Sequence, residues 1–254
     1  LAQPGLTLVA SRPNRRADLI ALDGSTIHSW KSRDEIGRWV RARLLQGGDI
    51  LVVGKGAEGP GEARYLQRID ASGEEVWRRS MAIHHEIATG PDGGWLTLEL
   101  SYRSIPAIHP TVPVRDDQIL FLDGEGRPLR RVSLYDSLSL AGVELTSVEP
   151  YVGDSGMMVD LFHSNSLFWM DGILKNVSAE WRRDPIYAAG GVLICIRHQN
   201  RVAILDSETG EHRWSWGPGE ISGPHDATLL ESGNVLIFDN GLGSGQSRVV
   251  EVDP

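Results

Sequence analysis

Two histidines in this sequence stand at corresponding points of a repeated pattern, although they are 140 residues apart. His85 and His225 each begin an apolar segment, and an acidic residue, Glu86 or Asp226, follows directly. Two imidazoles that face a common space can act as a nucleophile, as an acid–base pair or as metal ligands. The alternative is that each histidine only caps a turn at the start of a strand.

A second group of residues suited to chemistry is Arg197-His198, at the end of another apolar segment. A guanidinium offers parallel N–H groups that fit two oxygens of a tetrahedral oxyanion. The alternative is a surface arginine paired with a nearby carboxylate. His163, in the string Asp160-Leu-Phe-His-Ser-Asn-Ser166, is predicted to occupy the same repeat position as His198.

The elements that would position these residues belong to a repeat. Six segments share an apolar alternating run that ends in aspartate and precedes a turn: Asp18–Asp23, Tyr65–Asp70, Gln118–Asp123, Ser166–Asp171, Arg201–Asp206 and Arg248–Asp253. Their final aspartates are spaced by 47, 53, 48, 35 and 47 residues. A period in the forties with about four strands per unit is typical of a β-propeller.

A hairpin precedes these runs from the second unit onward, and it completes the four-stranded unit. The clearest copy begins at His225, turns on Ser232-Gly233-Asn234 and ends at Asp239. The first strand of each propeller blade lines the central channel, so residues at one register converge on one mouth. We therefore expect His85 and His225 to face the same channel. The tryptophans that recur on the outermost strands are expected to pack between blades.

The repeat predicts an all-β fold, a six-bladed β-propeller of about four-stranded blades, forming a single domain over residues 1–254. Its first unit lacks the leading strand, and its last unit stops before the final strand. Little helix is expected: Ser32–Leu45 is predicted to join a short helical turn to a strand. Ser101–Asp117 contains three prolines and is predicted to be an irregular loop over one mouth.

Composition limits the function classes. A net charge of −9 argues against a nucleic-acid partner, which would need a basic face. No apolar run approaches the length of about 18–20 residues that spans a bilayer, and the first residues do not form a signal peptide. The single Cys195 excludes an internal disulfide and a cysteine-based metal site. Its apolar surroundings predict a buried, inert thiol.

The C-terminal stretch resembles the bacterial arylsulfotransferase (aryl-sulfate sulfotransferase) family, whose members are six-bladed propellers. The resemblance is carried by four strings: Arg197-His-Gln-Asn200, His225-Asp-Ala227, Asp239-Asn-Gly241 and Ser247-Arg-Val-Val-Glu251. Nearer the N-terminus, His84-His-Glu-Ile87 before a Pro-Asp-Gly turn is also similar to the family.

The resemblance implies transfer of a sulfuryl group from an aryl sulfate to a phenol, without a nucleotide donor. It implies that His225 is the nucleophile and that Arg197 holds sulfuryl oxygens, with His85 as a second channel histidine. A third histidine of the family lies in a His-x-Asn-Ser string, which His163 matches, although the repeat places it in the blade before Arg197. Three further residues of these motifs are predicted to contact substrate: His198, His84 and Asn240.

The predicted partners are a small aromatic sulfate and a phenol, with no cofactor and no metal. The resemblance also implies a periplasmic or secreted location, and it leaves open a homo-oligomer or a protein partner. Two other functions are retained. One is a non-catalytic β-propeller that serves as a binding or assembly module with a degenerate site. The other is a related hydrolase or lyase that uses the channel site, with or without a metal.

Overall fold

The structure is a computed structural model, and it describes residues 4–11, 14–33, 37–56, 63–153, 156–174, 176 and 181–254. The chain forms two compact units, Leu1–Ile87 and Ala88–Pro254, which are described separately below. The single domain over residues 1–254 therefore stays a prediction.

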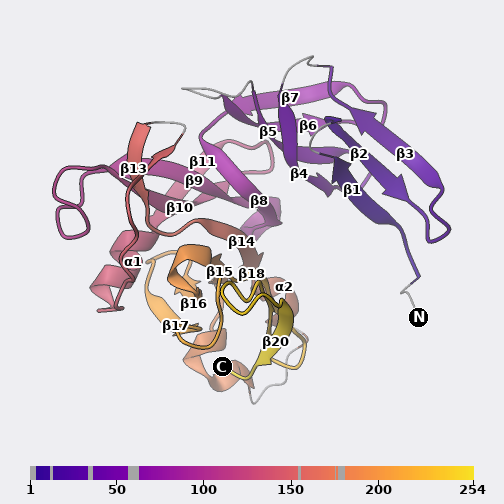
Figure 1. The fold of residues 1–254 in the computed structure, drawn as a ribbon. Coiled ribbons are helices and arrows are strands. Elements are labelled where there is room, and N and C mark those ends of the chain that lie inside the picture. Colours follow the sequence, from indigo (N-terminus) through magenta and orange to yellow (C-terminus); the bar gives the residue numbers. More distant parts are fainter. Residues whose placement is uncertain are drawn as a thin grey trace. The chain divides into compact units, whose positions relative to one another are not determined.

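Strands dominate both units (Figure 1). Across the described residues the strands form five sheets of three to six strands. Most neighbouring strands pair antiparallel, and β10 and β13 pair in parallel. The prediction of an all-β chain built from blade-like sheets is confirmed, but the prediction of six blades is wrong. The sheets at the two ends of the chain have three strands each, as the incomplete first and last repeats predict.

Unit 1 holds two sheets and the beginning of a third. The strands are β1 (Thr7–Ser11), β2 (Arg16–Ile20) and β3 (Thr26–Lys31), then β4 (Arg38–Leu44), β5 (Ile50–Lys55), β6 (Arg64–Ile69) and β7 (Glu75–Ser80). Trp30 and Trp39 are fully buried between the sheets, and Trp30 Nε1 donates to the carbonyl oxygen of Asp70 at 3.1 Å. The packing role predicted for the outer-strand tryptophans holds for Trp30, whereas Trp39 lies on the first strand of its sheet. The segment expected to begin helically is strand from Arg38 onward, and residues 34–36 lie outside the described part.

Unit 2 contains the other sheets. The remaining strands are β8 (Ile83–Thr89), within which the unit boundary falls, β9 (Trp95–Arg103), β10 (Val114–Leu122), β11 (Pro128–Ser133), β12 (Tyr151–Gly153), β13 (Gly156–Asp160), β14 (Ser164–Trp169), β15 (Gly191–Ile196), β16 (Arg201–Asp206), β17 (His212–Trp216), β18 (His225–Leu229), β19 (Val235–Asp239) and β20 (Arg248–Val252). The orders are β12-β13-β10-β9-β8 with β11 on β10, then β14-β15-β16-β17, and β18-β19-β20. Helices are short: α1 (Leu134–Leu140), α2 (Asp171–Leu174) and the 3₁₀ turns η1 (Pro91–Gly93), η2 (Trp181–Arg183), η3 (Pro185–Tyr187) and η4 (Arg197–Gln199).

The segment Ser166–Asp171 explains why five blades replace six. Its apolar run ends in aspartate like the third strand of a blade, but β14 is the first strand of its sheet. Asp171 begins α2 instead of a turn into a further strand. Two predicted units therefore merge into one blade, and the true third-strand aspartates Asp123 and Asp206 are 83 residues apart. Alternation alone does not tell an inner strand from an outer one, because both pack against neighbouring blades.

The predicted loop over Ser101–Asp117 is confirmed only for its middle part, because strands extend into both of its ends. β9 continues to Arg103 and β10 begins at Val114, so only residues 104–113 connect them. β13 pairs with β10 in parallel, with Val114 opposite Val159 and Arg115 opposite Asp160. This short parallel ladder brings two segments that are 45 residues apart to the same place, and it positions the site described below.

The core of unit 2 is continuous with the strands that carry the candidate site. All six residues of β15 are buried, and Cys195 is fully buried among them. This confirms the buried thiol predicted from the sequence. Across the described residues, no helix combines the length and the apolar character needed to cross a membrane.

Candidate functional site

His163 and His225 mark the same end of two neighbouring inner strands in unit 2. His163 directly precedes β14, and His225 is the first residue of β18. Asn165 Nδ2 donates to the carbonyl oxygen of Pro224 at 2.9 Å, and Ala227 N donates to Ser166 Oγ at 3.2 Å. These bonds join the two strands directly beside the two imidazoles.

This placement corrects two predictions for His163. It does not occupy the repeat position of His198, because His163 begins an inner strand whereas His198 follows the second strand, β15. It also does not lie in the blade before Arg197, since β14 and β15 belong to one sheet. The error follows from the mistaken strand order around Ser166–Asp171.

Both inner strands begin with an irregularity. The β18–β19 register shifts between His225 and Thr228, and the β14–β15 register shifts between Ser164 and Ser166. His163 has φ of 47° and Asp226 has φ of 49°, in the left-handed region that few residues other than glycine adopt. A bulge bends the strand and changes the direction of nearby side chains. The two histidines are thus set at points where the ladder is interrupted.

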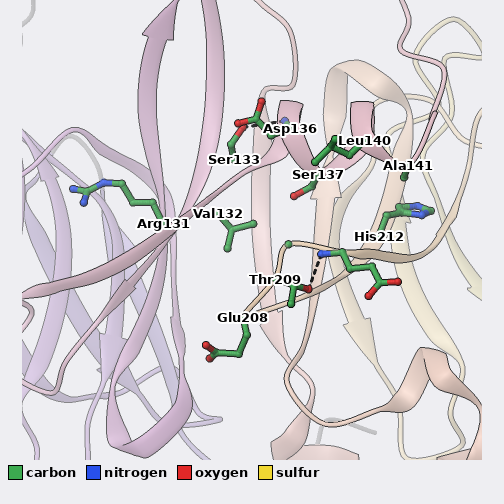
Figure 2. Close-up of a pocket in the computed structure, with 12 residues that line it drawn as sticks. Arg131, Val132, Ser133, Asp136, Ser137, Leu140, Ala141, Glu208, Thr209 and His212 are labelled. Atoms are coloured by element: carbon green, nitrogen blue, oxygen red, sulfur yellow. Dashed lines mark hydrogen bonds between the residues drawn. The ribbon is translucent and has the colours of Figure 1, made fainter.

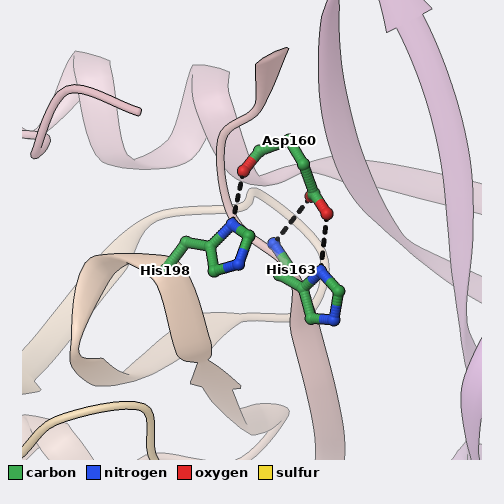
Figure 3. A group of neighbouring side chains, drawn as sticks. All are labelled: Asp160, His163 and His198. Atoms are coloured by element: carbon green, nitrogen blue, oxygen red, sulfur yellow. Dashed lines mark hydrogen bonds and ion pairs between the residues drawn. The ribbon is translucent and has the colours of Figure 1, made fainter. Parts of the chain in front are cut away.

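Asp160 holds two stacked imidazoles (Figure 3). His163 Nδ1 lies 2.5 Å from Asp160 Oδ2, and His198 Nδ1 lies 2.6 Å from the carbonyl oxygen of Asp160. The His163 and His198 ring centroids are 4.6 Å apart, with 30° between the planes. The backbone is tied as well, since His198 N donates to the carbonyl oxygen of Phe162 at 2.9 Å.

These contacts fix the tautomers of the two rings. A carbonyl oxygen only accepts, so Nδ1 of His198 carries the proton, and a carboxylate favours the same arrangement in His163. Burial lowers the pKa of His198; the hydrogen bond to Asp160 opposes this, and the neighbouring His163 and Arg197 lower the pKa further. His198 is therefore predominantly neutral at neutral pH, with its Nε2 lone pair available. The Nε2 atoms of both rings lie on the side away from Asp160 (Figure 3).

Asp160 is itself held by a buried ion network. Arg115 Nη1 contacts Asp160 Oδ2 at 2.9 Å, and Arg115 Nε contacts Asp117 Oδ1 at 2.9 Å. Both carboxylates are fully buried, and Ser164 N donates to Asp117 at 2.8 Å. Burial raises the pKa of Asp160, but the His163 hydrogen bond and the Arg115 charge outweigh it, so the pKa lies below its usual value. Asp160 is therefore an anion at neutral pH.

The Arg197-His-Gln-Asn200 string forms a 3₁₀ turn, and its last two residues hold the turn in place. Gln199 is buried, and its amide bonds the backbone of Thr146 and the carbonyl oxygen of Leu161 at 2.8 Å. Asn200, with φ of 48°, ends the turn, and its Oδ1 accepts from Gly223 N at 2.8 Å. These two amides fasten the turn that carries Arg197 and His198, and they connect it to the segment preceding His225.

Arg197 is half-buried, and among the residues that the structure describes its guanidinium has no ion-pair or hydrogen-bond partner. The alternative of a surface arginine paired with a carboxylate is therefore not seen. A guanidinium without an internal partner keeps its N–H groups available for an anion that bears oxygen acceptors.

His225 is held by the loop that follows β19. Its Nδ1 lies 3.1 Å from the carbonyl oxygen of Gly223 and 3.0 Å from Asn240 Nδ2, which also donates to Gly223 O at 2.8 Å. With Nδ1 protonated, His225 donates to Gly223 O and its Nε2 lone pair is available. With Nδ1 unprotonated, it accepts from Asn240 instead. The structure thus brings together two predicted site residues, His225 and Asn240.

The Asp239-Asn-Gly241 string serves to position Asn240. Buried Asp239 accepts from Ser222 N and Gly241 N, at 2.8 and 3.0 Å, and pairs with Arg248 Nε at 2.9 Å. Gly241 has φ of 60°, and a Cβ there would lie 2.0 Å from the carbonyl oxygen of Gln246. Only glycine fits this turn without moving the loop.

The predicted pair His84 and His85 lies in unit 1. Their Nδ1 atoms are 2.7 Å apart, so one ring donates and the other accepts. The acidic residue that follows His85, buried Glu86, forms an ion pair with Arg41. Its two carboxylate oxygens accept from the guanidinium at 2.8 and 3.2 Å. His85 has φ of 57°, so it too lies in the left-handed region. That His85 and His225 face one channel stays a prediction.

Asp160 and Arg115 are the site residues that sequence reasoning missed. Asp160 stood three residues before His163, a spacing that could have suggested a carboxylate–histidine pair. Arg115 lay inside the segment predicted to be loop. Its role depends on the parallel β10–β13 ladder, which leaves no local pattern in the sequence.

Two cavities in unit 2 lie apart from the three imidazoles. One of about 560 Å³ lies between α1 with β11 and the turn joining β16 to β17 (Figure 2). Its carboxylates Glu208 and Asp136 already pair with Arg130 and Arg103, at 2.9 and 2.7 Å. The other, of about 660 Å³, is bordered by Asn200, Asp239 and Gly241, residues that support His225. Neither cavity is lined by a predicted histidine.

Comparison with known proteins identifies the family of this chain. A family model described as Arylsulfotransferase (ASST) matches residues 41–254. The chain therefore belongs to the arylsulfotransferase family, as the resemblance predicted. No curated protein matches the chain in sequence.

Two solved structures share the fold. A protein of unknown function from Bacteroides caccae is 16% identical with a TM-score of 0.55, and the alignment covers 98% of this chain and 74% of that one. Kuenenia stuttgartiensis hydrazine synthase is 14% identical with a TM-score of 0.57, covering 96% of this chain and 68% of that one. At such low identity the similarity concerns the fold alone.

Proposed function

We propose that this protein transfers a sulfuryl group from an aryl sulfate to a phenolic acceptor through a covalent intermediate on His225. Membership of the arylsulfotransferase family supports the substrate class. The observation that carries the proposal is the pair of imidazoles, His163 and His225, at the starts of two joined strands, each with Nδ1 beside an oxygen acceptor. Such rings can offer Nε2 to an incoming substrate.

In the first half-reaction, the Nε2 lone pair of His225 attacks sulfur, and the bond between sulfur and the aryl oxygen breaks. The aryl oxide leaves with the bonding pair and takes a proton from Nε2 of protonated His163, whose cation the Asp160 carboxylate stabilises. The sulfated imidazole of His225 keeps its Nδ1 proton and is cationic. The carbonyl oxygen of Gly223 accepts that N–H and stabilises the intermediate.

The second half-reaction runs in reverse with a new phenol. The acceptor oxygen attacks sulfur, the nitrogen–sulfur bond breaks, and the electron pair returns to His225 Nε2. The phenolic proton passes to Nε2 of neutral His163, which restores the starting state. A positioned acid–base group typically contributes about 10²–10⁴-fold to the rate, and we expect His163→Ala to lose a factor in this range.

Arg197 has the electrostatic role in this proposal. The sulfuryl group carries its negative charge on three oxygens as the bonds to sulfur change, and a fixed guanidinium stabilises that charge. Because the fork of N–H groups matters as well as the charge, Arg197→Lys is expected to lower turnover, by about 10²–10³-fold for the loss of one such donor set.

His84, His85 and His198 are proposed as substrate contacts. For His84 and His85 this rests on the sequence resemblance, and His85→Ala tests it through the KM for the aryl sulfate. A periplasmic or secreted location is proposed on the same basis.

The test is release of nitrophenol from 4-nitrophenyl sulfate, with and without added phenol. We expect phenol-dependent turnover, and mass spectrometry of protein incubated without acceptor should show one added SO₃ group on the peptide containing His225. His225→Ala should abolish both signals, whereas His212→Ala on β17 should retain them. A folded wild-type protein with no turnover and no adduct would refute the proposal and favour the non-catalytic binding module.

A further inference from the structure

Asp160, His163 and His198 form a compact group of metal-binding side chains. One ligand atom from each residue lies within 4.8 Å of the others. The group comes from three elements: the end of β13, the residue before β14 and the turn η4 after β15. Three separate segments therefore converge here, each held by backbone hydrogen bonds or by the buried ion network.

The orientation of the two imidazoles is the one found at metal centres. A histidine ligand usually donates one ring N–H to a carboxylate or a backbone carbonyl, and binds the metal through the other nitrogen. Here His163 Nδ1 contacts the Asp160 carboxylate and His198 Nδ1 contacts the Asp160 carbonyl oxygen. Both Nε2 atoms lie on the side away from Asp160 (Figure 3). One aspartate thus supplies both orienting acceptors.

We propose that His163 and His198 bind a divalent transition ion, Cu²⁺ or Zn²⁺, through their Nε2 atoms, with Asp160 as the residue that orients both rings.

The donor set determines which ions fit. Imidazole nitrogen suits copper, zinc and nickel, whereas magnesium and calcium require several oxygen ligands. The Asp160 carboxylate is engaged by Arg115 and His163, so it is not available as a direct ligand. Metal–nitrogen bonds are about 2.0–2.1 Å long, so two nitrogens bound to one ion lie closer together than two stacked rings do without an ion. Binding therefore requires the ring of His163, whose side chain is 31% exposed, to tilt toward His198.

Charge also favours binding. The buried network beside the two rings holds two carboxylates, those of Asp117 and Asp160, against the single guanidinium of Arg115. Two protein ligands leave further coordination positions for water. The proposal does not rest on the proposed sulfuryl transfer, since it concerns equilibrium binding to the folded chain without substrate.

The test is calorimetric titration of the full chain with Cu²⁺ and Zn²⁺, together with electron paramagnetic resonance of the copper complex. We expect one equivalent of Cu²⁺ with two coordinated imidazole nitrogens, and no binding of Mg²⁺. His163→Asn and His198→Asn should each remove this equivalent. An asparagine amide can still donate to Asp160, and asparagine tolerates the left-handed backbone of residue 163. Asp160→Asn should weaken binding by about 10–100-fold.

His212→Ala is the matched control, because His212 is also a half-buried histidine of unit 2 but lies on β17. It should bind the ion as the wild type does. Wild-type affinity in both asparagine variants, or a copper signal without two imidazole nitrogens, would overturn the proposal. A wild type that fails to bind either ion at micromolar concentration would overturn it equally.

Discussion

Replacing Arg115 with methionine should destabilise unit 2 far more than the loss of an ordinary ion pair. The guanidinium contacts two carboxylates, Asp117 and Asp160, each at 2.9 Å. Its side chain is 9% exposed and both carboxylates are 0% exposed. Methionine fills much of the same volume with a flexible chain, but it leaves two buried anions without their cation.

The expected magnitude follows from this burial. Removing one partner of a buried ion pair costs about 3–5 kcal/mol, because the remaining charge cannot be solvated. For a unit the size of Ala88–Pro254, each kcal/mol lowers the melting temperature by about 2–4 °C. Arg115→Met should therefore lower the melting temperature by about 6–20 °C.

Differential scanning calorimetry provides the measurement, and Arg131→Met provides the control. Arg131 pairs with Glu99 at 2.5 Å, but its side chain is 46% exposed, and exposed pairs contribute about 1 kcal/mol or less. The control should melt within about 4 °C of the wild type. If Arg115→Met melted no lower than Arg131→Met, the argument that the buried network holds Asp160 in place would be refuted.

Three further outcomes are expected. Gly241→Ala should lower both the melting temperature and the turnover of 4-nitrophenyl sulfate, because its Cβ would meet the Gln246 carbonyl oxygen at 2.0 Å. Burial raises the pKa of Asp239, but backbone N–H bonds and Arg248 outweigh this and hold it below its usual value. Asp239 therefore stabilises the fold above the unfolded pKa of about 4, and this is lost as the pH falls through the lower folded pKa. Asp239→Asn should thus be less stable than the wild type at neutral pH in urea titrations, with the difference vanishing in acid. Burial raises the pKa of the Cys195 thiol, so a thiol reagent should modify it only in unfolded protein.

Local patterns in the sequence were enough for most strands. The predicted runs Arg201–Asp206 and His225 to Asp239 coincide with β16 and with the β18–β19 hairpin. Alternating apolar residues and glycine turns specify such hairpins through contacts between near neighbours. The number of blades could not be obtained in this way. Ser166–Asp171 has the pattern of a third strand, and only its pairing with β15 shows that it is a first strand.

Site residues that belong to a sequence motif could be predicted from the sequence. Contacts that depend on the pairing of distant strands could not. Asn240 was predicted to belong to the site, and it contacts His225 at 3.0 Å. The stacking of His163 on His198 was not predicted, because the strand order around β14 was mistaken. Arg115 and Asp160 meet across 45 residues through two rungs of a parallel ladder. Such short non-local ladders have no periodic signature in either strand.

Three residues near the starts of inner strands have left-handed backbone conformations, which lower the stability of the fold. His85, His163 and Asp226 hold φ values of 57°, 47° and 49°. Each such residue gives up about 1–2 kcal/mol of backbone free energy that glycine would recover. Substituting glycine at these positions would relieve the backbone strain and raise the thermal stability. At His85 and His163, however, the same substitution would remove an imidazole. At His85 and His163, stability and chemistry therefore favour different residues.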